Sequence, residues 1–257
     1  MFLKYSYCNI RKYQFYIHLC FIYLNAQLLP TIKFNIFTIM ILNTVIFDMD
    51  GLLIDSEPLW NQAADEIFEP YGFRLTPAQY ITTTGMRTKE FIEWWFNHYK
   101  ISLKHAQIAE DDLLKLVVQK VAHKGKAMQG VAHIFNFFID RKFKIGLATS
   151  SGNALIDVVV DKLGIRNYLQ AITSAADLPL GKPHPQVYLN CAEQLNSSPS
   201  ECICFEDSFN GLIAAKAARM KCIVVPAFHD RNNIKFNAAD LRISSLQNFN
   251  ELLLQTL

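Results

Sequence analysis

The sequence predicts an α/β fold, with a Rossmann-like parallel sheet core and an inserted helical cap domain. After Gly130, short apolar runs rich in β-forming residues alternate with single helical patterns. Between the first apolar run, at residues 42–47, and Gly130 the pattern is helical only. Acidic, hydroxyl and lysine side chains follow the apolar runs, and parallel sheets carry their sites at these strand ends.

The composition of the 257-residue chain changes near residue 40. The first 39 residues hold ten aromatic residues but no acidic residue and no glycine. We expect residues 1–39 to be an N-terminal extension outside the fold, with a membrane anchor or targeting signal as the alternatives. We expect residues 40–56 and 127–257 to form the α/β catalytic core and residues 57–126 to form the helical cap.

The expected elements follow from periodicity. A buried strand at residues 42–47 ends at Asp48. In the cap, Leu59 and Ala63 share one face of a first helix, Thr88 caps a second, and a third covers residues 108–121. In the core we expect helices at 131–140, 154–163, 186–195 and 210–220, and strands at 144–148, 171–173, 202–205 and 222–225.

Polar residues with related chemistry follow these predicted strands. In chain order they are Asp48 and Asp50, Thr149 and Ser150, Lys182, and Glu206 and Asp207. Each fragment alone is common in turns and helix caps, but together, at successive strand ends, they indicate one site. Acids alone would repel one another, and a hard dication such as Mg²⁺ would hold them together. Hydroxyl, backbone N–H and lysine groups beside that ion would bind a phosphate.

The segment from Phe47 to Ser56 (FDMDGLLIDS) resembles the first motif of the haloacid-dehalogenase superfamily. Thr149, Lys182 and the pair Glu206-Asp207 resemble the second, third and fourth motifs. The stretches DSEPLW, KPHPQVY and EDS with the following NG are similar to those of bacterial phosphatases for 2-deoxyglucose 6-phosphate and hexitol phosphates, with β-phosphoglucomutase as a close relative. The resemblance covers about residues 41–250.

The resemblance implies a mechanism in which Asp48 attacks phosphorus and becomes an aspartyl phosphate, while Asp50 is the general acid and base. It implies Mg²⁺ held by Asp48, the Asp50 carbonyl and Asp207, with Glu206 in support. The residues expected to hold the phosphate or the substrate are Thr149, Ser150, Lys182, Arg87 and Asn153. Thr84 to Thr88 is expected to be the cap loop facing the site, with a plain helix–helix turn as the alternative.

The expected function is therefore an Mg²⁺-dependent phosphatase for small sugar or sugar-alcohol phosphates. A β-phosphoglucomutase-like mutase is one alternative, but mutases of this family carry His where this chain has Trp60. A non-enzymatic phospho-acceptor or binding protein is another. A receiver domain does not carry its acceptor on the first strand, and a non-catalytic relative would be expected to have lost Asp48 or Asp50.

Charge and cysteine usage restrict the partners. The 25 basic and 23 acidic residues leave a net charge of +2, which is atypical of a nucleic-acid binder. The six cysteines include no CxxC pair, and Cys202 and Cys204 alternate on a predicted strand as small core residues. We expect a cytoplasmic monomer with a phosphorylated small-molecule substrate and no nucleic-acid or membrane partner.

Overall fold

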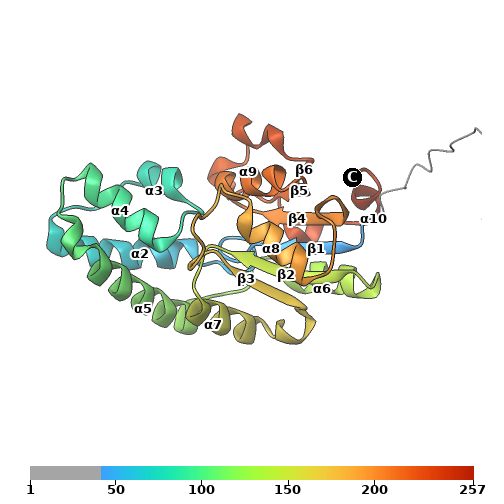
Figure 1. Cartoon of the computed structure of the whole chain (residues 1–257), viewed down its shortest axis with the longest axis horizontal. Helices are drawn as coiled ribbons and strands as arrows, with labels where there is room; N and C mark the ends of the chain where they lie inside the picture. Colours follow the sequence, from blue (N-terminus) through green and yellow to red (C-terminus); the bar gives the residue numbers. More distant parts are fainter. Residues whose placement is uncertain (1–41) are drawn as a thin grey trace, which may run out of the picture. The chain divides into compact units, whose positions relative to one another are not determined.

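A computed structural model describes residues 42–257. The predictions for residues 1–39 therefore lie outside the described residues. The described chain builds one six-stranded parallel sheet in the order β3-β2-β1-β4-β5-β6 (Figure 1). Its strands are β1 (Thr44–Phe47), β2 (Lys144–Thr149), β3 (Ala171–Ser174), β4 (Cys202–Glu206), β5 (Lys221–Val224) and β6 (Leu241–Arg242).

The strand order places a crevice beside β1. The chain first adds strands on one side of β1, through β2 and β3, and then returns to add β4, β5 and β6 on the other side. Such a reversal opens a crevice beyond the carboxyl ends of the two strands that flank it, here β1 and β4. The residues that follow β1 and β4 therefore face each other.

Helices cover both faces of the sheet, since successive side chains of β1 point to opposite faces and both faces are buried. Val45 and Phe47 belong to one buried cluster, and the rings of Phe47 and Phe135 stack at 5.0 Å between centroids. Ile46 belongs to the other cluster, with Tyr188. The first face is covered by α6 (Val131–Asp140), α7 (Asn153–Leu163) and the C-terminal α10 (Glu251–Leu254), and the second by α8 (Gln186–Gln194) and α9 (Phe209–Ala217).

A helical insertion separates β1 from β2 and lies at one end of the sheet, on the left of Figure 1. Phe68, Phe73 and Phe96 are buried within it, in the same apolar cluster as Phe47, and the rings of Phe68 and Phe73 stack at 4.5 Å between centroids. Its helices are α2 (Glu57–Phe68), α3 (Pro77–Thr83), α4 (Thr88–His98) and α5 (Ala106–Lys124). The predicted α/β fold with a helical insertion is thus confirmed.

Some local predictions were wrong. Thr88 does not cap the second helix of the insertion, because it is the first residue of α4 and Arg87 occupies the N-cap position. The helix expected at 210–220 is α9 (Phe209–Ala217), and Met220 lies instead in the buried turn that leads into β5. The two-residue strand β6 was not predicted, since two residues are too few to show a periodicity.

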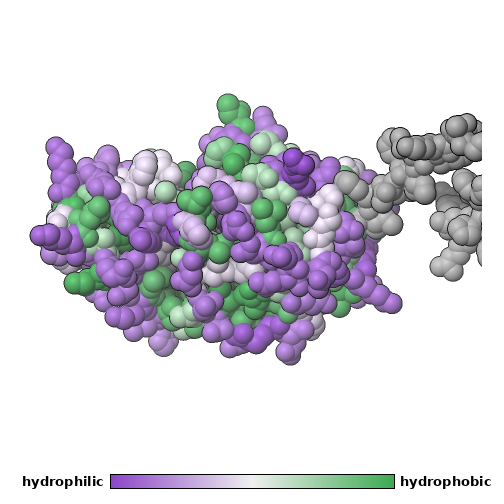
Figure 2. Space-filling model, in the orientation of Figure 1, coloured by the Kyte–Doolittle hydropathy of each residue, from purple (hydrophilic) through white to green (hydrophobic). Residues whose placement is uncertain are grey.

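The surface of the described residues is mostly hydrophilic on the face drawn in Figure 2, where hydrophobic residues form small separate groups. No helix between residues 42 and 257 is long and apolar enough to cross a membrane.

Candidate active site

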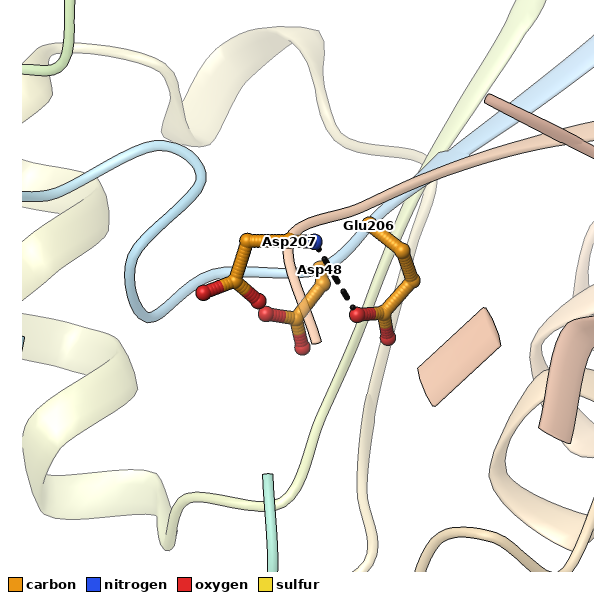
Figure 3. A group of neighbouring side chains, drawn as sticks. All are labelled: Asp48, Glu206 and Asp207. Atoms are coloured by element: carbon orange, nitrogen blue, oxygen red, sulfur yellow. Dashed lines mark hydrogen bonds between the residues drawn. The ribbon is translucent and has the colours of Figure 1, made fainter. Parts of the chain in front are cut away.

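Three carboxylates meet where β1 and β4 end. Asp48 follows β1 directly, Glu206 is the last residue of β4, and Asp207 comes next. One oxygen from each lies within 4.8 Å of the others, and all three side chains are buried (Figure 3). Buried like charges this close require a compensating cation. The acidic residues predicted at the ends of β1 and β4 therefore form one negatively charged group.

Lys182 supplies one such cation. Its Nζ lies 2.6 Å from Oδ1 of Asp48 and 2.7 Å from Oε1 of Glu206. The ammonium also donates to the carbonyl of Ala148 at 3.1 Å and contacts the Tyr188 hydroxyl at 3.2 Å. With a side chain only 1% exposed, Lys182 is a fixed charge beside the acidic group.

Both oxygens of Glu206 are taken by protein donors. Oε1 accepts hydrogen bonds from Lys182 and from the Tyr188 hydroxyl. Oε2 accepts from the backbone N–H groups of Asp207 and Ser208, each at 3.2 Å, and from the Ser208 hydroxyl at 3.1 Å. Glu206 is therefore suited to holding Lys182 and the turn after β4 in place, which agrees with a supporting role.

Asp48 and Asp207 have the donor chemistry of an Mg²⁺ site. The carboxylate of Asp207 accepts no hydrogen bond from the described residues, and neither does the second oxygen of Asp48. Gly51, with a φ of +74°, brings the turn after β1 so close that a Cβ there would lie 2.1 Å from Oδ2 of Asp207. Unsatisfied carboxylate oxygens are the ligands that Mg²⁺ prefers, so these residues fit the ion.

The titration of the acidic group reflects the shortage of positive charge. Burial raises the pKa of Asp48 from 3.8 to about 7, although Lys182 opposes the shift. Burial, followed by repulsion from Glu57, Asp48 and Glu206, raises the pKa of Asp207 well above its ordinary value. Burial lowers the pKa of Lys182, but Asp48 and Glu206 together outweigh it, so the lysine keeps its proton. At neutral pH the site therefore favours a second cation.

Asp50, two residues after Asp48, is held by three donors. The Ser56 hydroxyl and the Trp60 indole N–H donate to Oδ1 at 2.6 Å and 3.0 Å. The Ser151 hydroxyl donates to Oδ2 at 2.7 Å. Sequence reasoning named Trp60 only for its difference from the mutases and missed this contact. The spacing of four residues between Ser56 and Trp60, which places both on one face at the start of α2, was the available signal.

A cavity of about 350 Å³ lies between the sheet edge and the helical insertion, within the size range of small-molecule sites. Its floor carries Asp48, Asp50, Thr149, Ser150, Ser151 and Asp207. Its other walls include Trp60, Asn61, Tyr80, Ile81, Thr83, Thr84, Met86, Phe91 and His229. Most of these wall residues lie outside the sequence motifs described above. Their place in the cavity follows from the tertiary fold alone.

Three residues that were predicted to hold the phosphate or the substrate do not line this cavity: Lys182, which is bound to Asp48 and Glu206, and also Asn153 and Arg87. Asn153 is exposed in the first turn of α7. Arg87 directs its guanidinium to the carbonyls of Ala175 and Leu178, in the loop after β3. Neither of these two side chains lines the cavity, and their contact with the substrate stays a prediction. The other residues of the predicted cap loop, Thr84, Gly85, Met86 and Thr88, do line the cavity.

Comparison with known proteins gives consistent results. A family model described as haloacid dehalogenase-like hydrolase matches residues 45–225. Hexitol phosphatase B of Escherichia coli (strain K12) is 36% identical over 202 residues, covering 78% of this chain and 91% of that protein. The phosphorylated carbohydrates phosphatase of Thermotoga maritima is 30% identical over 193 residues, covering 74% of this chain and 88% of that protein.

Solved structures share the fold. The crystal structure of β-phosphoglucomutase from Clostridium difficile matches with a TM-score of 0.73, covering 84% of this chain and 96% of that one at 23% identity. At this identity the likeness is evidence for the shared architecture.

Proposed function

Because the chain belongs to the haloacid dehalogenase-like hydrolase family, we propose that it is an Mg²⁺-dependent phosphatase of small sugar or sugar-alcohol phosphates. Relatives named for hexitol phosphates and phosphorylated carbohydrates support this substrate class. The observation that carries the proposal is the position of Asp48, buried at the end of β1, bound to Lys182 through one oxygen and on the cavity floor.

In the proposed first step, one carboxylate oxygen of Asp48 attacks phosphorus and the bond from phosphorus to the sugar oxygen breaks. Lys182, 2.6 Å from Oδ1 of Asp48, opposes the rise in pKa that burial causes and so favours the ionised nucleophile. It also balances the negative charge of the phosphoryl group. Bound Mg²⁺, held by Asp48, Asp207 and the Asp50 carbonyl, would supply the remaining positive charge for the transferring oxygens.

Asp50 would serve both half-reactions. It gives its proton to the departing sugar oxygen, and as a carboxylate it then takes a proton from the water that attacks the aspartyl phosphate. The hydroxyls of Ser56 and Ser151 can donate to the carboxylate or accept from the acid, so both protonation states fit the same surroundings. The Trp60 N–H can only donate, and it fixes the position of Oδ1 of Asp50.

Thr149 and the residues after it would hold the phosphate oxygens. The Thr149 hydroxyl lines the cavity and accepts the backbone N–H of Ser151 at 3.1 Å, which leaves its own proton free to donate. Of the remaining predicted groups, Ser150 lines the cavity beside it. Arg87 and Asn153 have no part in this proposal.

We treat residues 57–126 as the cap and residues 40–56 with 127–257 as the catalytic core. The hinges would be residues 57–59 and 126–130, where the chain passes between the two parts. A cap that closes over Asp48 excludes bulk water during the first step and contributes the cavity walls that select the substrate. The four described cysteines, all unpaired, support a reducing compartment such as the cytoplasm.

A panel of phosphorylated sugars and polyols tests the proposal, with release of inorganic phosphate as the readout. We expect turnover of one or more members with Mg²⁺ and none in excess chelator. The Asp48→Asn variant should lose turnover while keeping a single cooperative thermal unfolding transition. Transfer of phosphate within the sugar, without release, would support the mutase instead, and turnover in excess chelator would overturn the metal requirement.

A further inference from the structure

The loop between α3 and α4, residues 84–87, is bound to the core by polar contacts. The Ser150 hydroxyl donates to the carbonyl of Gly85 at 2.9 Å. The side-chain amide of Asn210 donates to the carbonyl of Thr84 at 3.0 Å. Ser150 follows β2, and Asn210 lies in the first turn of α9, after β4. Residues that follow two strands of the core therefore hydrogen-bond to the insertion.

Arg87 adds a third contact in the opposite direction, from the insertion to the core. Its Nη1 donates to the carbonyl of Ala175 at 3.3 Å and to that of Leu178. Its Nη2 pairs with Glu90, one turn further along α4. The side chain is only 11% exposed, so this ion pair and these hydrogen bonds are shielded from water.

The side chain of Arg87 also lies directly over Gly181. A Cβ at position 181 would lie 2.6 Å from Nε, 2.8 Å from Cγ and 2.9 Å from Cδ of Arg87. Both the absence of a side chain at Gly181 and the two carbonyls are therefore needed for this contact. Gly181 directly precedes Lys182, so the segment that Arg87 holds is the one that delivers Lys182 to the site.

We propose that Arg87 is a positioning residue that holds the cap against the loop of residues 175–181, and that it acts on the reaction through cap closure. The proposal rests on the phosphatase assignment only for its effect on turnover. Nη1 of Arg87 is taken by the two carbonyls and Nη2 by Glu90, while the buried Nε has no partner among the described residues. Since Arg87 also does not line the cavity, this role differs from substrate binding.

The first test does not depend on catalysis. Amide hydrogen exchange in the full-length protein reports the opening of residues 84–88 and 175–181. We expect faster exchange in both segments in Arg87→Gln, which keeps the length of the side chain but loses its charge and its fork of donors. Arg74→Gln is the matched control, because among residues 42–257 Arg74 pairs only with Glu69, within the insertion, and both are exposed. Unchanged exchange in Arg87→Gln would overturn the proposal.

The second test is a double-mutant cycle between positions 87 and 181. Gly181→Ala should displace the Arg87 side chain, and we expect it to lower kcat/KM about tenfold when Arg87 is present. In the Arg87→Ala background no side chain remains to be displaced, so adding Gly181→Ala should change kcat/KM less than twofold. Equal effects of Gly181→Ala in both backgrounds would contradict the contact.

The third test separates positioning from substrate binding. A closing residue acts on every substrate that needs the closed cap, so Arg87→Gln should lower kcat/KM by a similar factor for two sugar phosphates that differ in length. The inhibition constant of inorganic phosphate, which needs only the core, should stay within twofold. A loss confined to one sugar phosphate, or a weaker phosphate inhibition, would show that Arg87 binds substrate and would overturn the proposal.

The two proposals fail in distinguishable ways. If the protein releases no phosphate from the panel but amide hydrogen exchange responds to Arg87→Gln, the phosphatase assignment fails and the positioning role of Arg87 stands. If the protein is an active phosphatase and amide hydrogen exchange does not respond, only the positioning role of Arg87 fails.

Discussion

The indole N–H of Trp60 donates a hydrogen bond to the carboxylate of Asp50 at 3.0 Å, which links the first helix of the insertion directly to the proposed acid and base. Ser56, which precedes that helix, donates to the same oxygen at 2.6 Å. The position of Asp50 therefore depends on how the start of α2 (Glu57–Phe68) lies against the core, so the insertion bears on the chemistry as well as on the cavity walls.

Replacing Trp60 with Phe should remove this donor while preserving most of the cavity wall. A hydrogen bond to a charged group contributes about 1.5–3 kcal/mol, and two donors remain on Asp50, so we expect kcat to fall about tenfold with a smaller change in KM. Trp94→Phe is the control, because Trp94 is 54% exposed on α4 and should leave kcat unchanged. Equal kcat values for Trp60→Phe and the unchanged protein would show that the contact does not serve catalysis.

Asp50→Asn should slow phosphorylation of the enzyme in proportion to the basicity of the leaving group. A sugar alkoxide needs a proton to depart, so we expect a loss on the order of 10²- to 10⁴-fold for a hexitol phosphate. An aryl phosphate, whose leaving group departs without a proton, should lose much less. Single-turnover rapid-quench measurements on both substrates check this, and equal losses would remove Asp50 from the role of acid.

Stabilisation by Mg²⁺ should grow as the pH rises. The pKa of Asp48 is raised to about 7 in the folded state, so its protonation stabilises the metal-free fold at low pH and that stability is lost as the pH rises through about 7. The raised pKa of Asp207 acts in the same direction. Mg²⁺ competes with these protons, so its gain in melting temperature should be larger at about pH 8 than at about pH 5.5. Thermal melts in Mg²⁺ and in chelator measure the difference, and a gain that shrinks with rising pH would contradict the metal assignment.

Lys182→Met should destabilise the metal-free protein by about 3–5 kcal/mol, because it leaves the buried carboxylates of Asp48 and Glu206 without their cation. The double variant Lys182→Met with Glu206→Gln should recover part of that loss, since one buried charge is then removed. Urea unfolding at neutral pH in chelator compares them. A single variant as stable as the unchanged protein would mean that the acidic group does not depend on Lys182.

The sequence was sufficient to predict which residues of the candidate site lie along the sheet edge. Asp48, Thr149 and Asp207 were expected at strand ends, and the parallel sheet brings all three to the cavity. Strand ends are readable because a buried apolar run has a definite last residue. The chemical roles proposed for these residues stay predictions.

The direction of long side chains could not be predicted in the same way. Arg87 lies in the loop that was expected to face the site, but its rotamer follows the carbonyls of Ala175 and Leu178, more than 80 residues further along the chain. Asn153 comes soon after Thr149 and Ser150, yet the turn into α7 carries it to the surface. Both outcomes depend on contacts between distant segments, which no local pattern encodes.

The most direct test of the account is to identify the residue that carries the phosphoryl group. The enzyme would be mixed with Mg²⁺ and a hexitol phosphate that it turns over, quenched in acid within one turnover, and reduced with borohydride, which converts an aspartyl phosphate to homoserine. Peptide mass spectrometry then locates the modified position. We predict homoserine at position 48 and none in the Asp48→Asn variant. Turnover without a trapped phosphoenzyme, or modification of Asp50 or Asp207 in place of Asp48, would contradict the account.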